Sequence, residues 1–115
     1  MSRLHNDGKA NKMAYGQFGS AFKNTIAGNL TPPTGQVIIA IQMLSEMKFD
    51  VLTPEDETKC FGVTSSTHGA GSGGVAVDSS NVFGEGMTIY GRWTAVSLSG
   101  SSDYANGGVI CYFGE

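Results

Sequence analysis

The chain of 115 residues has few charged residues, only three prolines and only two cysteines. Charged side chains make up 15% of the sequence, compared with about 25% in typical soluble domains. No apolar run is long enough to span a membrane, and Met1–Ser20 lacks the hydrophobic stretch of a signal peptide. We therefore expect a single domain that is made in the cytoplasm and has no membrane partner. Cys60 and Cys111 are expected to be buried, reduced thiols, and a disulfide between them is the alternative.

Basic and acidic residues are unevenly distributed along the chain. Residues 1–35 contain four basic residues and one acidic residue, a net charge of +3, whereas residues 36–115 contain three basic and nine acidic residues, a net charge of −6. A basic arm on an acidic body favours binding to a partner or to other copies of the chain, and a solvated tail is the alternative. Four cations without an arginine run are too few for a nucleic-acid-binding patch.

Apolar residues of the basic segment follow a helical spacing. The intervals of three and four residues predict one face of a helix, which would pack on the domain's own sheet or on a neighbouring subunit. Two prolines in Thr31–Gly35 then predict a stiff break, with an extended, partly helical arm at residues 1–35 and a body at residues 36–115. The residues of this apolar face are Tyr15, Phe18, Phe22, Ile26 and Leu30.

The body has the pattern of a mainly β protein. Short apolar runs alternate with the 17 glycines and with serine, asparagine and aspartate, which is typical of a compact antiparallel β-sandwich or barrel of six to seven short strands. Thr53–Asp56 predicts a short helix or turn, and the runs after Gly86 predict hairpins. The predicted strands are Val37–Leu44, Met47–Val51, Cys60–Thr64, Val75–Val77, Met87–Tyr90, Trp93–Leu98 and Val109–Phe113.

Chemical motifs are weak throughout the chain. The loop Gly69–Gly74 has the glycine spacing of a dinucleotide site, but the residues that follow favour a short strand rather than a helix, so we expect a flexible surface loop. His5 and His68 have no further ligand at metal-binding spacing. A nucleophilic pair of Cys60 with His68 lacks an identifiable third residue. The sequence therefore predicts no catalytic residue, no metal and no cofactor.

The most distinctive short stretch is Tyr90-Gly91-Arg92-Trp93-Thr94. Gly91 among apolar strand residues predicts a bulge or bend where another backbone comes close. Trp93, the only tryptophan, is expected in the core, although a binding hot spot beside Arg92 is the alternative. Arg92 is expected outside the core, where it can contact a partner.

The segment TIYGRWTAVSLS, followed by a glycine-rich turn and VICYFG, resembles the C-terminal module of small virion proteins of tailed phages. The resemblance covers Thr88–Gly114 only. It implies a β-rich structural protein of the virion, without enzyme activity, that forms an oligomer, usually a trimer. We therefore expect a capsid decoration (cement) protein that assembles with copies of itself and clamps neighbouring capsid subunits through its N-terminal arm. Its expected partners are the major capsid protein or other virion proteins, and a receptor- or glycan-binding head-fibre or tail-fibre module is the alternative. The residues expected at the partner contact are Tyr15, Phe18, Phe22, Ile26 and Arg92.

Overall fold

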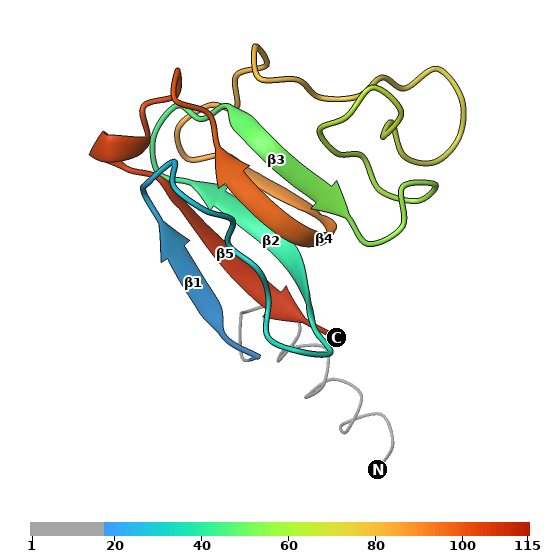
Figure 1. Cartoon of the computed structure of the whole chain (residues 1–115), viewed down its shortest axis with the longest axis horizontal. Coiled ribbons are helices and arrows are strands. Elements are labelled where there is room, and N and C mark those ends of the chain that lie inside the picture. Colours follow the sequence, from blue (N-terminus) through green and yellow to red (C-terminus); the bar gives the residue numbers. More distant parts are fainter. Residues whose placement is uncertain (1–17) are drawn as a thin grey trace.

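The computed structural model describes residues 18–115, which form an antiparallel sheet of five strands (Figure 1). The strands occur in the order β1-β5-β2-β4-β3 across the sheet. A short 3₁₀ helix, η1 (Tyr104–Asn106), precedes the last strand. The prediction of a mainly β, antiparallel fold is confirmed for this part of the chain. The strands are β1 (Ser20–Lys23), β2 (Val37–Met43), β3 (Phe49–Pro54), β4 (Thr88–Leu98) and β5 (Val109–Gly114).

The number of strands is smaller than predicted. All five described strands belong to one sheet with edges at β1 and β3, rather than to a two-sheet sandwich or a closed barrel. Cys60–Thr64 and Val75–Val77 form no strands, because they lie in a long connection in which Gly71 and Gly73 have positive φ angles and turn the chain repeatedly. The expected helix or turn after Thr53 is the end of β3, followed by a turn.

The two strands of the C-terminal block are not neighbours. The prediction of hairpins after Gly86 is wrong, because β2 lies between β4 and β5 and pairs with both of them. The run Val37–Met43 is almost entirely apolar, and a strand of this kind is best buried at the centre of a sheet. The connection from β4 to β5 therefore crosses the end of β2.

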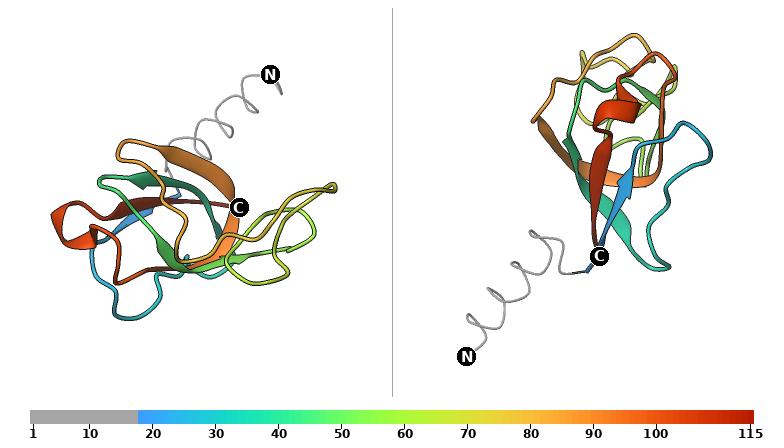
Figure 2. Two further views of the ribbon diagram at one scale, coloured as in Figure 1. Left: turned by 90° about the horizontal axis from the view of Figure 1, so that it is seen from above. Right: turned by 90° about the vertical axis from the view of Figure 1, so that its left-hand side faces the viewer.

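Strand β4 is long and changes partners along its length. Thr88–Trp93 pairs with β2, whereas the second half pairs with β3 from Trp93 to Leu98, with register shifts in both ladders. Where β2 has ended, Leu30 pairs with the side of β4 that β2 no longer covers. The N–H of Leu30 donates to Val96 O at 2.8 Å, and the N–H of Val96 donates to Leu30 O at 3.0 Å. Figure 2 shows the resulting curled sheet, with η1 and the β3–β4 connection at opposite ends.

The described part of the predicted arm belongs to this sheet. Ser20–Lys23 is the edge strand β1, paired with β5, so the helix expected over Tyr15–Leu30 is wrong for residues 20–30. Gly19 and Gly28 have φ angles of 112° and 74°, which interrupt a helix, and β5 supplies the backbone hydrogen bonds that the helix would have made. The expected arm upstream of Phe18 lies outside the described residues.

The core lies on the inner face of the sheet. Side chains of the loops, including Phe61 and Phe83, pack against it. Lys23 is buried at the end of β1, and its ammonium group donates to Ala27 O at 3.0 Å, which holds the chain that follows the strand. The buried cluster consists of Ile38, Ile41, Met43, Met47, Phe49, Leu52, Trp93, Val96, Leu98, Val109, Cys111 and Phe113.

Candidate functional site

Within residues 18–115, two neighbouring rows of side chains on the opposite face of the sheet contain no charged residue across four strands. Residues that are paired across an antiparallel ladder point to the same side, so the ladder register defines two rows of neighbouring side chains. Ala21, Cys111, Ile41 and Ile89 form a row that packs into the core. Because successive residues of a strand point to opposite faces, the rows on either side of it point away from the core. We call this surface the outer face; its rows are Phe22–Ile110–Gln42–Thr88 and Ser20–Tyr112–Ala40–Tyr90.

Two aromatic residues of the outer face are well exposed. Phe22 on β1 is 56% exposed and Tyr90 on β4 is 74% exposed, at opposite ends of the surface. Tyr112 lies between them and donates its hydroxyl hydrogen to Gln42 Oε1 at 3.5 Å. The outer face therefore combines exposed aromatic rings with uncharged polar groups, which is typical of a surface that contacts another molecule.

Within residues 18–115, the edge of the outer face at β1 has backbone hydrogen-bonding groups that no other described strand pairs with. Phe113 donates its N–H to Gly19 O at 3.0 Å, so Gly19 and every second residue after it direct their backbone groups toward β5. By this alternation, the N–H and C=O groups of Ser20 and Phe22 point away from β5. An exposed strand edge of this kind can pair with a strand of another chain.

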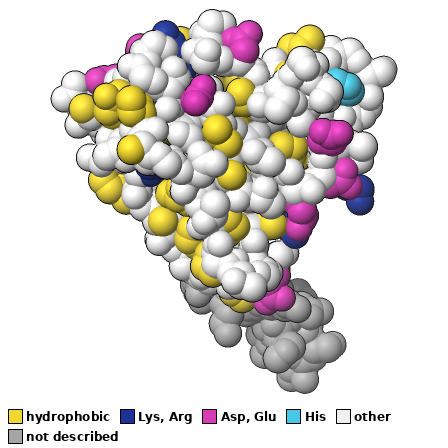
Figure 3. Space-filling view, viewed as in Figure 1, with side chains coloured by type: hydrophobic (Ala, Val, Ile, Leu, Met, Phe, Trp, Pro, Cys, Tyr) yellow, Lys and Arg dark blue, Asp and Glu magenta, His cyan; other side chains and the backbone are white. Residues whose placement is uncertain are grey.

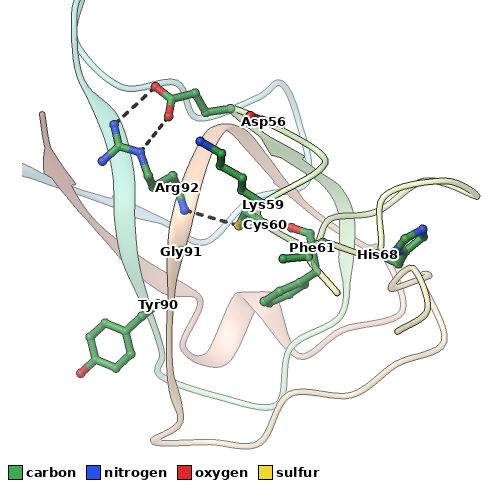
Figure 4. Close-up of a pocket in the computed structure, with 11 residues that line it drawn as sticks. Asp56, Lys59, Cys60, Phe61, His68, Tyr90, Gly91 and Arg92 are labelled. Carbon is green, nitrogen blue, oxygen red and sulfur yellow. Dashed lines mark hydrogen bonds and ion pairs between the residues drawn. The ribbon is translucent and has the colours of Figure 1, made fainter. Parts of the chain in front are cut away.

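A pocket of about 460 Å³ lies away from the β1 edge, between β4 and the connection that follows β3 (Figure 4). Its walls include Glu55, Lys59 and Cys60 from the connection, together with Tyr90 and Arg92 from β4. Figure 3 shows acidic side chains along the margin of the molecule over the connection that follows β3. Basic side chains accompany them in the pocket, so its charge is mixed.

An ion pair forms one side of this pocket. Arg92 Nε lies 2.7 Å from Glu55 Oε1 and Arg92 Nη2 lies 3.4 Å from Glu55 Oε2, with both side chains nearly half exposed. The hydrogen bond from Arg92 holds the pKa of Glu55 below its usual value, and the same bond raises the pKa of Arg92. The N–H of Glu55 also donates to Arg92 O at 2.8 Å, which fixes the two chain segments to each other.

The wall behind the ion pair is tightly packed around Gly91. The N–H of Arg92 donates to Cys60 Sγ at 3.4 Å, and the indole N–H of Trp93 donates to Phe61 O at 2.9 Å. Trp93 is fully buried, which confirms the prediction of a core tryptophan. The ladder between β2 and β4 shifts its register between Tyr90 and Trp93, which confirms the predicted bulge at Gly91. A Cβ atom on Gly91 would lie 2.8 Å from Cys60 Sγ, so a side chain rather than another backbone approaches this glycine.

The side chains considered for catalysis do not form a reactive pair. Cys60 and His68 both line the pocket, but Phe61 lies between them and the imidazole points away from the sulfur (Figure 4). Cys60 and Cys111 are both free; Cys111 is buried, whereas Cys60 is only partly buried. Within residues 18–115, no three His, Cys, Asp or Glu side chains are arranged to hold a metal ion.

The structure separates the residues that the sequence singled out for partner binding. Phe22 lies on the edge strand β1, and Ile26, 46% exposed, follows it in a loop. Arg92 lies on β4, which β5 and β2 separate from β1. Phe18 is partly buried, and Tyr15 lies outside the described residues.

Sequence reasoning missed Tyr90, Tyr112 and Gln42 as surface residues. The alternation in Val109–Phe113 was available as a signal, since Ile110 and Tyr112 point away from the buried residues on either side of them. The rows of the outer face depend on the ladder register, and no local sequence pattern specifies that register.

Comparison with known proteins adds no relative. The chain matches no known family model, and no curated protein or solved structure is significantly similar to it. In the part of the chain that the structure describes, no helix is long and apolar enough to cross a membrane.

Proposed function

We propose that the chain is a non-enzymatic structural protein of a phage virion, and specifically a capsid decoration protein. In this proposal it forms an oligomer, a trimer by the resemblance above, and binds the major capsid protein on the surface of the particle. The observation that carries the proposal is the uncharged outer face, with an exposed phenylalanine beside the free edge of β1.

The distribution of charge supports self-association through this face. Residues 18–115 contain four basic and nine acidic residues, a net charge of −5, so two copies repel each other over most of their surfaces. A contact confined to the two rows of the outer face, away from Arg92, brings no charged side chain of either copy into the interface. It therefore avoids the cost of burying an unpaired charge.

The edge of β1 indicates where on the outer face this contact lies. Ser20 and Phe22 direct backbone groups outward, and Phe22 adds an apolar side chain beside them. Strand pairing at an edge uses backbone hydrogen bonds for affinity and adjacent side chains for specificity. We place the contact between copies at β1 and β5, with Phe22, Ile110 and Tyr112 at its centre.

Residues 1–17 give the proposed contact with the capsid. They contain three basic residues and one acidic residue, which complements an acidic surface, and they include Tyr15. The resemblance of Thr88–Gly114 to phage virion proteins supports a virion protein as the partner. Ile26 and Phe18 lie close in sequence to β1 and extend the proposed contact.

The test of self-association compares two exposed apolar residues. Phe22→Ser is expected to shift the purified protein from oligomer to monomer in light scattering coupled to size exclusion. Val75→Ser is the matched control, because Val75 is 80% exposed and lies in the β3–β4 connection, away from β1. A wild-type protein that is monomeric at every concentration, or equal behaviour of the two variants, would refute the proposed contact.

The test of virion location uses the native gene. The chain is tagged at its locus, particles are purified on a density gradient, and the tag is sought on intact capsids. Deletion of residues 1–17 leaves every described strand in place and is expected to abolish recovery with the particles without unfolding the protein. Absence of the full-length chain from particles, or full recovery of the deletion variant, would contradict this proposal.

A further inference from the structure

The turn that leads into β5 contains Asn106-Gly107, the only asparagine in the sequence that is followed by glycine. Asn106 is the last residue of η1 and is exposed, and η1 projects from one end of the sheet (Figure 1). Glycine has no Cβ to hinder the approach of its backbone nitrogen to the preceding side chain. The pair therefore places an accessible side-chain amide next to an unhindered backbone nitrogen.

The backbone nitrogen of Gly107 is only weakly held in the turn. Its N–H donates to Tyr104 O at 3.5 Å, longer than the usual range of about 2.7–3.2 Å. None of the three residues of η1 is buried, and a 3₁₀ helix has poorer hydrogen-bond geometry than an α-helix. A short exposed segment of this kind opens locally at low cost in free energy, while the sheet stays folded.

Ser45 confines this opening to η1 and Gly107. Its hydroxyl donates to Asp103 O at 2.6 Å, before the helix, and accepts the N–H of Gly108 at 3.2 Å, after it. The N–H of Asp103 also donates to Glu46 O at 3.0 Å. The Gly107 nitrogen can therefore turn toward the side chain of Asn106 without release of the residues on either side of the turn.

We propose that Asn106 is a site of spontaneous deamidation in the folded protein. The Gly107 nitrogen attacks Asn106 Cγ, and the new N–Cγ bond closes a succinimide ring. The Cγ–Nδ2 bond breaks, and Nδ2 leaves as ammonia with the proton that the Gly107 nitrogen has lost to the solvent. Water then adds to either ring carbonyl and opens the ring, which leaves aspartate or isoaspartate at position 106; water is the only co-reactant.

The product weakens the turn before β5. Asn106 Nδ2 donates to Asp103 Oδ1 at 2.8 Å, whereas a carboxylate at position 106 cannot donate and repels Asp103. Isoaspartate also inserts a methylene group into the backbone before Gly107, where a Cβ atom would already lie 2.6 Å from Ser45 Oγ. Deamidation thus adds a negative charge and loosens the entry to β5 irreversibly, with no partner required.

The experiment follows deamidation in the purified full-length chain, kept in mildly alkaline buffer with and without urea and then digested with trypsin for mass spectrometry. The peptide of residues 93–115 contains Asn106 as its only asparagine, and the peptide of residues 60–92 contains only Asn81, which is also exposed but precedes Val82. A zero-time sample corrects for deamidation during digestion.

In the native protein, the peptide of residues 93–115 is expected to exchange its amide for a carboxylate at least about tenfold faster than the peptide of residues 60–92, because the branched Val82 hinders the same attack. Conversion that occurs only in urea would show that the fold protects Asn106, and equal rates for the two peptides would show that Gly107 confers no reactivity. Either result would overturn the proposal.

Two variants test the effect on the turn. Asn106→Asp reproduces the aspartate product and is expected to shift the unfolding equilibrium in urea about fivefold toward the unfolded state. Asn81→Asp is the matched control, because it adds the same charge but keeps an oxygen that accepts the N–H of Asp78, at 2.9 Å in the wild type. Equal stability of the two variants would refute a specific weakening of the turn at Asn106.

Discussion

Substitution of Gly91 by alanine tests the packing that forms the pocket wall. A Cβ atom at this position would lie 2.6 Å and 2.7 Å from two ring carbons of Trp93, and 2.8 Å from Cys60 Sγ. These distances are well below van der Waals contact, and the fully buried indole has no free space into which to move. Overpacking of this kind costs about 1–3 kcal/mol, so we expect Gly91→Ala to lower the free energy of unfolding by about 2 kcal/mol.

Urea unfolding, followed by the fluorescence of Trp93, measures this loss directly. Gly84→Ala is the matched control, because a Cβ at Gly84 would have no atom within 4 Å; we expect it to change stability by less than about 1 kcal/mol. Cys60→Ala in the Gly91→Ala background removes one of the two clashes and is expected to recover part of the loss, as a double-mutant cycle would reveal. Equal stability of Gly91→Ala and Gly84→Ala would show that the glycine is not tightly enclosed.

Two further predictions concern ionisable groups. Burial raises the pKa of Cys111 from 9.0 to about 12, so the folded protein keeps the thiol neutral where the unfolded chain ionises it; stability is retained below about pH 9 and is lost as the pH rises toward 12. Between about pH 8 and about pH 10.5, the free energy of unfolding measured in urea should fall by about 2 kcal/mol more for wild type than for Cys111→Ala. Parallel pH profiles of the two proteins would refute the raised pKa of Cys111. Because Arg92 lowers the pKa of Glu55, the small stability advantage of wild type over Glu55→Gln is present at neutral pH and should disappear as the pH falls below 4.5; an advantage that persists in acid would show that the ion pair is not its source.

The sequence predicted local elements better than their arrangement. The apolar runs of β2 and β5 identified both strands, because burial in a sheet leaves a run of apolar residues in the sequence. Trp93 was correctly expected in the core. The insertion of β2 between β4 and β5 was not predicted, because pairing between strands distant in sequence depends on the whole set of competing partners rather than on either strand alone.

The apolar spacing through Phe22 and Ile26 shows how a local pattern can mislead. Intervals of four residues fit one face of a helix, but in the structure Phe22 lies on an edge strand and both side chains are exposed. The positive φ angles of Gly19 and Gly28 are incompatible with a continuous helix. Pairing with β5 instead provides hydrogen-bond partners for backbone N–H and C=O groups of β1. Helical spacing indicates a helix only where the intervening residues also favour one.

The pocket and the outer face differ in how closely their side chains contact the core, and this difference determines how substitutions in each should affect stability. Gly91 and Phe61 of the pocket wall pack directly against the buried Trp93, so substitutions there are expected to change the stability of the fold. Phe22 and Tyr90 are exposed, and their removal leaves the buried cluster intact. We therefore expect the free energy of unfolding of variants at either residue to stay within about 0.5 kcal/mol of the wild-type value, so that any loss of assembly reports on the contact itself. A large loss of stability in Phe22→Ala would instead show that β1 is held in the sheet by this side chain, and a partner contact would then have to be tested at the free backbone edge of Ser20.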